Sequence, residues 1–229
     1  SFQTDTDRMF QTNIIGTKNL VDACLKGGFS AFVNTGSSSE YGFKSREAKE
    51  SDCLEPNSYY AVAKAAATHY CCYVAKTYKV PIATFRLYAV YGPYEEPTRL
   101  IPTVIRHALK GQEIKMVSPD TGRDFVYIDD VVNAYLCLDK LRGQYGEIFN
   151  IGTGVQSTVY DVVSMVEGIT QKKIDAKWNE TPPRIWDTNI WVANVKKSQD
   201  VLKWRAKNNL RNGLSTTVDW FRKNKDIIP

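Results

Sequence analysis

The sequence predicts an α/β protein in which helices cover a doubly wound, parallel sheet, followed by a smaller α/β part. Three observations predict this class. Helical and strand-like segments alternate along the chain, as in proteins with parallel sheets. Two short apolar runs, Ala31–Thr35 and Pro81–Arg86, have the length and the boundaries of buried strands. The 229 residues are 43% hydrophobic and 24% charged, which is the balance of a globular chain large enough to bury a core.

The first part of the chain contains two predicted helices, one before each of these strands. Apolar residues at helical spacing predict a helix over Asp7–Lys26, and a pair of glycines ends it. An alanine-rich segment, Ser58–Lys79, predicts a second, longer helix. Because the first element is already a helix and few strands can be counted, one flank of a doubly wound sheet is missing from the pattern.

The second part begins near Tyr94, where a proline-rich loop interrupts the alternation of helices and strands. Helices and strands continue to alternate after it. The predicted elements are a helix ending at Leu109, a strand at Phe125–Ile128, a helix at Asp129–Leu141, a strand at Glu147–Ile151 and a helix at Ser157–Ile169.

Charge and apolar patterning exclude several classes of protein. The net charge of +5 is small, and the basic residues near the end of the chain are mixed with Leu and Trp, as on a solvated helix face, so we expect no nucleic-acid partner. No apolar run approaches the length of a membrane-spanning helix, so we expect no membrane partner. The first residues also lack the pattern of a signal peptide.

Cysteine and histidine counts limit the chemistry. The five cysteines have no metal-type spacing and are interpreted as reduced, structural thiols, which predicts a cytoplasmic protein. With only two histidines, His69 and His107, a histidine-based triad or a multi-histidine metal site is excluded, and we expect no metal.

Tyr60 and Lys64 form the strongest local feature. Four residues along a helix place both side chains on one face. A phenol normally loses its proton near pH 10, and a neighbouring ammonium favours the phenolate, so such a tyrosine can exchange protons closer to neutrality. The pair alone is also compatible with an ordinary exposed helix face.

Three further segments carry candidate chemistry. Residues 35–42, Thr-Gly-Ser-Ser-Ser-Glu-Tyr-Gly, directly follow the first strand, at the strand end where open α/β sheets bind ligands. A hydroxyl there can hold a substrate oxygen, although a plain Ser/Gly turn has the same composition. The other two segments are Arg86–Pro93, a strand followed by a Gly-Pro turn, and Arg123–Val131.

In this order and at this spacing, the segments resemble the extended short-chain dehydrogenase/reductase family, the NAD-dependent sugar-nucleotide epimerases and dehydratases. The resemblance runs from about Asn13 to Trp220. The matching motifs are Asn13 with Gly16 and Thr17, Ser37 ahead of Tyr41-Gly42, Tyr60-x-x-x-Lys64, Arg123-Asp-Phe-Val-Tyr-Ile-Asp-Asp130, Asn150-Ile-Gly-Thr-Gly154, and Arg184 with Asp187.

This resemblance implies a Rossmann-like fold and an NAD or NADP cofactor across the strand ends. Tyr60 would be the acid/base at a sugar hydroxyl or ketone, Lys64 would bond the nicotinamide ribose and lower the Tyr60 pKa, and Ser37 would hold the reacting oxygen. The same three residues and Asn13, Leu87 and Tyr88 would contact the cofactor.

The resemblance also implies a nucleoside-diphosphate sugar as substrate. Arg123 and Arg184 would clamp its diphosphate, because guanidinium groups suit phosphate oxygens. Ser38, Leu100 and Asp187 would complete the substrate site. We therefore expect residues 1–95 to be the remainder of an NAD(P)-binding domain with the catalytic residues, and residues 96–229 to be mainly a substrate domain.

Departures from the family pattern favour some activities over others. Ala89 stands where the family usually has a substrate-contacting Asn. Dehydratases have an acidic residue one or two places after the strand-end hydroxyl, where this chain has Ser38 and Ser39, with Glu40 one place later. We therefore predict an epimerase or 4-ketoreductase, with a 4,6-dehydratase as the alternative.

The family's Gly-x-x-Gly-x-x-Gly turn, which places a pyrophosphate at a helix N-terminus, is missing from the sequence. We interpret the chain as a fragment that lacks the N-terminal Gly-rich part, and a non-catalytic nucleotide-sugar-binding protein on the same scaffold stays an alternative. The sugar, the nucleotide base and the choice of NAD or NADP are left open. The resemblance further implies a homodimer, with Asp7–Lys26 and Ser58–Lys79 as the candidate contact helices.

Overall fold

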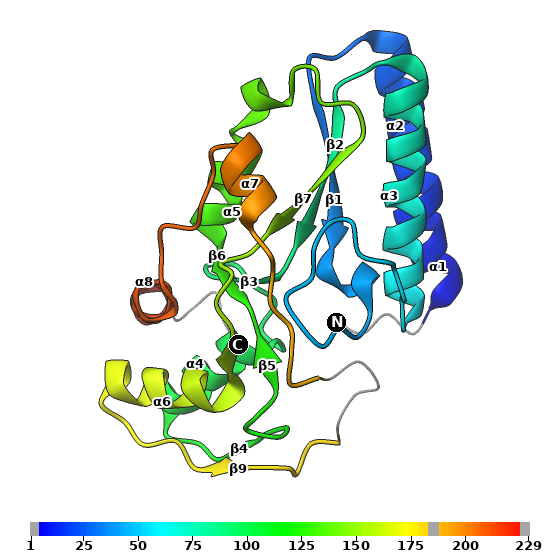
Figure 1. Cartoon of the computed structure of the whole chain (residues 1–229). Helices are drawn as coiled ribbons and strands as arrows, with labels where there is room; N and C mark the ends of the chain where they lie inside the picture. The colour runs from blue at the N-terminus through cyan, green and yellow to red at the C-terminus, as the bar shows by residue number, and fades with distance from the viewer. Residues whose placement is uncertain (1–4, 183–187, 225–229) are drawn as a thin grey trace.

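A parallel sheet of three strands forms the centre of the upper part of the molecule in Figure 1, in the order β1-β2-β7. The computed structural model describes residues 5–182 and 188–224. The strands are β1 (Phe32–Ser37), β2 (Ile82–Leu87) and β7 (Glu147–Ile151). In their register, Ser37 lies beside Leu87, and Leu87 lies beside Ile151. The carboxyl ends of all three strands therefore meet at one edge of the sheet.

Helices cover both faces of this sheet, as the sequence predicts (Figure 1). On one face lie α1 (Thr6–Phe10), the π-helical turn η1 (Gln11–Ile15), α2 (Gly16–Gly27) and α3 (Tyr59–Tyr78). Val21 and Val74 from these helices pack with Ile82 of β2 in a buried apolar cluster. The structure differs from the single helix predicted over Asp7–Lys26, because the π-helical turn η1 interrupts it. The spacing of apolar residues does not reveal one such wide turn.

The other face is covered by segments from the second half of the chain. These are α5 (Ile128–Tyr135), the 3-10 turn η3 (Leu138–Leu141) and α7 (Lys196–Val201). Phe85 and Phe149 of the sheet pack there against Trp204, whose indole Nε1 donates to the Asp130 carbonyl at 2.9 Å. The helix predicted over Asp129–Leu141 is in fact split into α5 and η3.

The lower part of the molecule consists of short paired strands and helices (Figure 1). Its helices are α4 (Leu100–Lys110), α6 (Val159–Thr170) and α8 (Leu210–Lys223), and they bury one apolar core. The strand pairs are β3 (Ala89–Tyr91) with β6 (Phe125–Tyr127), β4 (Ile114–Lys115) with β9 (Ala176–Lys177), and β5 (Gly122–Arg123) with β8 (Ser157–Thr158).

The chain passes between the two parts more than once. Strand β7 returns from the second half of the sequence to complete the first sheet, and a bridge between Ala48 and Ala193 joins the loop after β1 to the segment before α7. Among the described residues, no helix has the length and apolar character needed to span a bilayer. The predicted α/β class with a parallel sheet is confirmed.

A candidate active site at the carboxyl ends of the central strands

Strand β1 ends at Ser37, which begins the 3-10 turn η2 (Ser38–Tyr41). The Ser37 hydroxyl oxygen accepts from the Ser39 amide at 3.2 Å and lies 2.8 Å from the Ser39 hydroxyl. In return, Oε1 of Glu40 accepts from the Ser37 amide at 2.9 Å. This reciprocal capping box fixes the main chain at the end of the strand.

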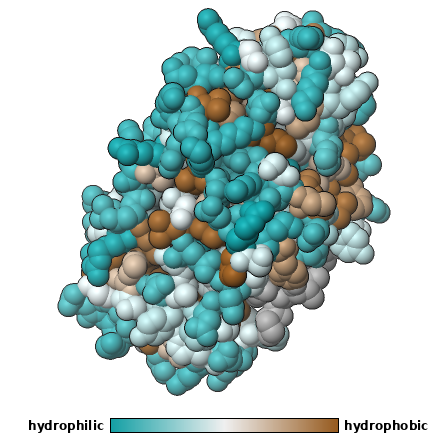
Figure 2. Space-filling model, in the orientation of Figure 1, coloured by the Kyte–Doolittle hydropathy of each residue, from teal (hydrophilic) through white to brown (hydrophobic). Residues whose placement is uncertain are grey.

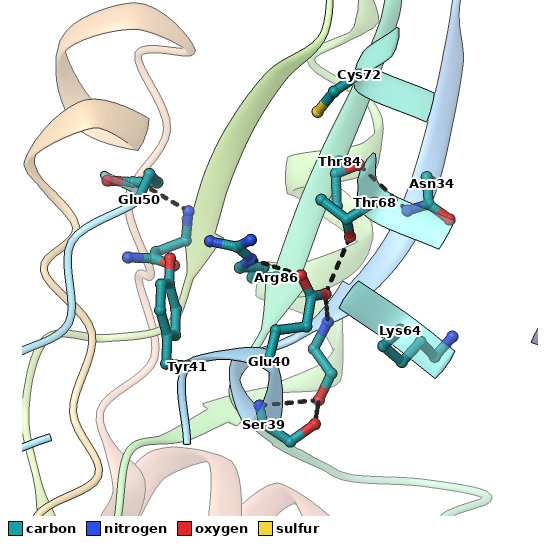
Figure 3. A network of polar contacts seen from close by, with 12 residues as sticks. Asn34, Ser39, Glu40, Tyr41, Glu50, Lys64, Thr68, Cys72, Thr84 and Arg86 are labelled. Atoms are coloured by element: carbon teal, nitrogen blue, oxygen red, sulfur yellow. Dashed lines mark hydrogen bonds and ion pairs between the residues drawn. The ribbon is translucent and has the colours of Figure 1, made fainter. Parts of the chain in front are cut away.

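The Glu40 side chain is fully buried beneath this turn. Its Oε2 accepts from Nε of Arg86 at 2.8 Å, and its Oε1 also accepts from the Thr68 hydroxyl at 3.1 Å. Figure 3 shows that these partners come from different elements, with Arg86 on β2 and Thr68 on α3. The carboxylate therefore joins the turn to the strand and to the helix on either side of it.

Tyr41 extends the network to the third strand. The Arg86 guanidinium lies over its ring, 4.5 Å from the centroid, and its hydroxyl donates to Oδ1 of Asn150 on β7 at 2.7 Å. The next residue, Gly42, has a φ of 66°, and a Cβ there would lie 1.9 Å from the carbonyl oxygen of Glu55. The turn can leave the strand in this direction only because residue 42 is glycine.

Helix α3 brings Tyr60 and Lys64 to the same edge. The Ser58 hydroxyl caps the helix by accepting from the Ala61 amide at 3.1 Å, so Tyr60 lies in the first turn. The Lys64 ammonium is 5.7 Å from the centroid of the Tyr60 ring and donates to the Thr35 carbonyl at 2.9 Å. Thr35 belongs to the strand that ends at Ser37, so the hydroxyl, the phenol and the amine meet in one place.

The electrostatics differ from the expectation based on Lys64. Burial raises the pKa of Tyr60 above its ordinary value, although a hydrogen bond with Ser37 and the positive charge of Arg99 act in the opposite direction. Burial also lowers the pKa of Lys64, and the negative charge of Glu40 partly offsets this effect. A lowered Tyr60 pKa is therefore not found, because burial of the phenol is the larger influence.

Ser38 faces the second part of the molecule. Its buried hydroxyl accepts from Nε1 of Trp191 at 2.9 Å, and both residues line a small hollow together with Tyr88. The guanidinium of Arg123 lies 5.2 Å from the centroid of the same Trp191 ring, and its Nη1 donates to the Gly122 carbonyl at 2.6 Å. Trp191 thus connects the turn after β1 to the strand that carries Arg123.

The remaining predicted residues have the following places. Leu87 ends β2 beside Ser37, and Tyr88 follows it with a buried hydroxyl that has no hydrogen-bond partner among the described residues. Asn13 lies in the π-helical turn that packs against α3, and its amide donates to the Met9 carbonyl at 2.9 Å. Leu100 begins α4 and packs against the core of the second part. Arg184 and Asp187 lie outside the described residues.

Several residues around this site have roles that the motifs did not predict. Arg86 is only 1% exposed, and a lone arginine in an apolar strand signals a buried partner, here Glu40. The Asp124 carboxylate, from the Arg123–Asp130 motif, is buried and accepts from the amides of Thr153, Gly154 and Ala193. It is thus a structural anchor, and no sequence signal pointed to Trp191. Within residues 5–182 and 188–224, no three metal-ligand side chains gather into a metal site.

Comparison with known proteins agrees with this geometry. The profile of the NAD dependent epimerase/dehydratase family matches residues 2–152. The dTDP-D-glucose 4,6-dehydratase of Mus musculus is 30% identical over 93% of this chain and 61% of its own length. The chain spans 61% to 66% of the length of the first four curated relatives that it matches.

Solved structures are similar over nearly the whole chain. MoeE5 in complex with UDP-glucose and NAD has a TM-score of 0.87 and 31% identity over 93% of this chain and 72% of that chain. The UDP-glucose 4-epimerase of Thermotoga maritima with UDP-glucose has a TM-score of 0.88 and 28% identity over 96% of this chain and 72% of that chain. The resemblance found in the sequence motifs is confirmed.

Proposed function

Because the chain belongs to the NAD dependent epimerase/dehydratase family, we propose that it is the catalytic part of an NAD(P)-dependent enzyme that acts on a nucleoside-diphosphate sugar. The observation that carries this proposal is the meeting of Ser37, Tyr60 and Lys64 at the carboxyl ends of the strands. A hydroxyl, a phenol and an amine at this edge are the groups needed for proton transfer beside a bound cofactor.

The side chains present fit a nicotinamide cofactor. Lys64 uses one donor on the Thr35 carbonyl, and an ammonium has three, so the others can bond ribose hydroxyls. Tyr60 is 42% exposed as a residue, so part of its side chain faces the solvent at this edge, where a ligand can contact it. Leu87, Tyr88 and Asn13 are proposed to complete the cofactor contacts. NAD or NADP, when bound, supplies the hydride acceptor and donor.

The protein's own contribution is to hold the sugar and to move a proton. We assign the proton transfer to the Tyr60 hydroxyl, at a sugar hydroxyl in the oxidation direction and at a ketone in the reduction direction. The Ser37 hydroxyl holds the reacting oxygen, and the Lys64 ammonium stabilises negative charge that develops on the phenol.

We propose that the substrate's diphosphate is bound by residues of the second part, 96–229. Among the described residues, Arg123 is the candidate for this contact, since its guanidinium can pair with phosphate oxygens. Ser38 and Leu100 would contact the substrate nearby, and Arg184 and Asp187 would complete the site. MoeE5 and the Thermotoga maritima enzyme, which bind UDP-sugars, support this class of ligand.

Epimerisation or 4-keto reduction is favoured over dehydration. Removal of water requires a positioned acid and base besides the tyrosine. Glu40 is the acidic residue of the turn after β1. Its described hydrogen bonds are to Ser37, Thr68 and Arg86, so they fix the fold of the turn. The similar dehydratases keep dehydration as the alternative. Formation of a 4-keto-6-deoxy sugar from dTDP-glucose would favour it.

The Tyr60→Phe variant tests the proposed activity. Phenylalanine preserves the ring but cannot transfer a proton, so we expect turnover of UDP-glucose or dTDP-glucose to fall about 100- to 10,000-fold while the fold is kept. Product formation is measured by chromatography on protein supplied with NAD or NADP. Tyr59→Phe, on the neighbouring, 64% exposed residue, is the matched control and should keep full activity.

Two outcomes would contradict this assignment. If Tyr60→Phe is as active as Tyr59→Phe, Tyr60 is not the proton donor. If the unmodified protein binds UDP-glucose but turns over no nucleotide sugar with either cofactor, the chain is a non-catalytic binding protein on this scaffold.

We further propose a cytoplasmic homodimer that pairs through α2 and α3. Large apolar side chains on these helices are solvent-exposed in the single chain, including Leu20, Val62 and Tyr73. Figure 2 shows hydrophobic surface along the edge where Figure 1 draws these helices. The free form of all five cysteines agrees with a reducing compartment.

The Leu20→Glu variant tests the proposed dimer. A charge buried at a helix contact is unfavourable, so the variant should sediment as a monomer while the unmodified protein sediments as a dimer. Val155→Glu, on a 64% exposed residue elsewhere, should leave the mass unchanged. A monomer of the unmodified protein at micromolar concentration would contradict the proposal.

A further inference from the structure

We propose that Glu40 is a positioning residue for this reaction, and that its buried carboxylate, paired with Arg86, holds Ser37 in place. The inference rests on the proposed function, because the Ser37 hydroxyl acts on a substrate only if the site carries out that chemistry. In this proposal Glu40 contacts neither the cofactor nor the nucleotide sugar, and it acts through Ser37 alone.

Both oxygens of the Glu40 carboxylate accept hydrogen bonds from neighbouring elements (Figure 3). Oε1 accepts from the Ser37 amide at 2.9 Å and from the Thr68 hydroxyl at 3.1 Å, and Oε2 accepts from Nε of Arg86 at 2.8 Å. Glu40 is 0% exposed and Arg86 is 1% exposed. A buried ion pair of this kind is seldom more stable than an apolar pair of the same volume.

Stability alone therefore does not explain why a carboxylate stands at position 40. An apolar side chain could fill the same space, but it could not accept a hydrogen bond from the Ser37 amide. What Glu40 adds is a fixed direction for the main chain at the end of β1. Because Ser37 returns a bond to the Ser39 amide, its backbone and its hydroxyl are held together.

The surroundings of Gly36 show how closely this position is set. A Cβ on Gly36 would lie 2.7 Å from Oε1 of Glu40 and 2.7 Å from Cγ2 of Thr84. The strand therefore passes directly over the carboxylate. A shift of the carboxylate would move the last two residues of the strand, and the Ser37 hydroxyl with them.

Glu40 also sets the distance between Ser37 and helix α3. Its partner Thr68 is four residues after Lys64 and eight after Tyr60, on the same side of the helix. The carboxylate thus ties the strand end that carries the hydroxyl to the helix that carries the phenol and the amine. Proton transfer at one substrate oxygen requires that the distance between these groups is kept.

Two substitutions at position 40 separate positioning from packing. Glu40→Met keeps the volume but removes both acceptors, so we expect kcat to fall about 10- to 100-fold with little change in KM. Glu40→Gln can still accept from the Ser37 amide, so it should recover much of the loss, and it also serves if Glu40→Met does not fold.

Thr84→Val is the control, since it removes a different buried hydrogen bond of the same sheet, from Asn34 at 3.1 Å. It should lower stability and leave kcat unchanged.

A double-mutant cycle with Ser37→Ala decides whether Glu40 acts through Ser37. If it does, Ser37→Ala combined with Glu40→Met should be no slower than Ser37→Ala alone. Multiplied losses in the double variant would overturn the proposal, and so would a Glu40→Met variant whose kcat matches that of Thr84→Val.

Hydrogen exchange gives a measurement that needs no substrate. In 15N-serine-labelled protein, the Ser37 amide should exchange at least about tenfold faster in Glu40→Met than in the unmodified chain and Thr84→Val. Unchanged exchange at Ser37 would overturn the proposal even if the enzyme is active. If no nucleotide sugar is turned over, the proposed function fails, while the exchange of Ser37 still decides whether Glu40 positions it.

Discussion

Tyr41 is the residue that connects the turn after β1 to strand β7. It is 1% exposed, and its hydroxyl donates to Asn150, whose amide nitrogen Nδ2 in turn donates to the Ala48 carbonyl at 2.8 Å. Burial raises the pKa of Tyr41 to about 12, although the charge of Arg86 acts in the opposite direction. The phenol therefore stays neutral in the folded protein at pH values where an unfolded tyrosine has begun to ionise.

This pKa predicts a loss of stability at alkaline pH. A group whose folded pKa lies above its unfolded value stabilises the fold fully below pH 10, and that contribution is lost as pH rises from 10 to about 12. The loss from Tyr41 reaches about 2 to 3 kcal/mol at the upper end. Tyr41→Phe should be less stable near pH 8, by about 1 to 2 kcal/mol, because Asn150 loses its donor.

Urea unfolding at pH 8 and pH 11.5 measures this effect. The stability difference between the unmodified protein and Tyr41→Phe should shrink at the higher pH. Tyr94→Phe, at a residue that is 79% exposed, gives the background change. A difference that is equal at both pH values would show that ionisation of Tyr41 is not linked to unfolding.

The sequence motifs predicted which residues gather at the strand ends, but not the hydrogen bonds that these residues and their neighbours make. Helix spacing placed Tyr60 and Lys64 on one face, and the family resemblance implied that Ser37 at the strand end lies beside them. The partner of Glu40 is 46 residues away along the chain, and that of Ser38 is 153 residues away. Such pairs depend on tertiary packing, so the sequence shows neither the buried ion pair of Glu40 nor the contact between Trp191 and Ser38.

At the scale of elements, the cap of α3 matters because Tyr60 lies in the first turn. The Ser58 hydroxyl bonds the Ala61 amide, and Ser58→Ala should cost about 1 kcal/mol of stability. Because a frayed first turn moves Tyr60, kcat should fall as well, by several-fold. Removal of the capping side chain from a distant helix separates the loss of stability from the loss of kcat.

Asn209→Ala is that matched control. Asn209 caps α8 by accepting from the Asn212 amide at 2.9 Å, far along the chain from the candidate site. Thermal unfolding should report a similar loss for both variants, with kcat reduced in Ser58→Ala only. Equal kcat in the two variants would mean that the cap of α3 does not position Tyr60.

Elements with strong periodic patterns were predicted well, whereas those defined by single bonds were not. The strand at Glu147–Ile151 agrees in full, and α3 lies one residue inside the expected limits at each end. The π-helical turn at Gln11–Ile15 and the two-residue strands leave no periodic pattern. The turn is one wide turn inside a helix, and the short strands arise from pairing with distant segments. Ser157 and Thr158, expected within a helix, instead pair with β5 before α6 begins.

At the scale of the whole molecule, the candidate site depends on how its two parts meet. Trp191 is a direct link between them, since its indole donates to Ser38 beside the proposed proton-transfer residues and lies against the guanidinium of Arg123. If Arg123 binds the diphosphate, this contact sets where the phosphates lie relative to Ser37.

The Trp191→Phe variant tests this link. Phenylalanine keeps an aromatic ring for Arg123 but has no N–H to donate to Ser38, and one neutral hydrogen bond corresponds to about a 2- to 10-fold change in binding. We expect KM for the nucleotide sugar to rise by this factor, with kcat reduced less and NAD(P) affinity unchanged. Trp178→Phe is the control: Trp178 lies in the second part against Tyr160, 6.1 Å between ring centroids. Steady-state kinetics with calorimetric titration of the cofactor distinguish the outcomes. A fall in kcat at constant KM would place Trp191 with the proton-transfer groups, whereas equal kinetics in the two variants would mean that the two parts are held together without it.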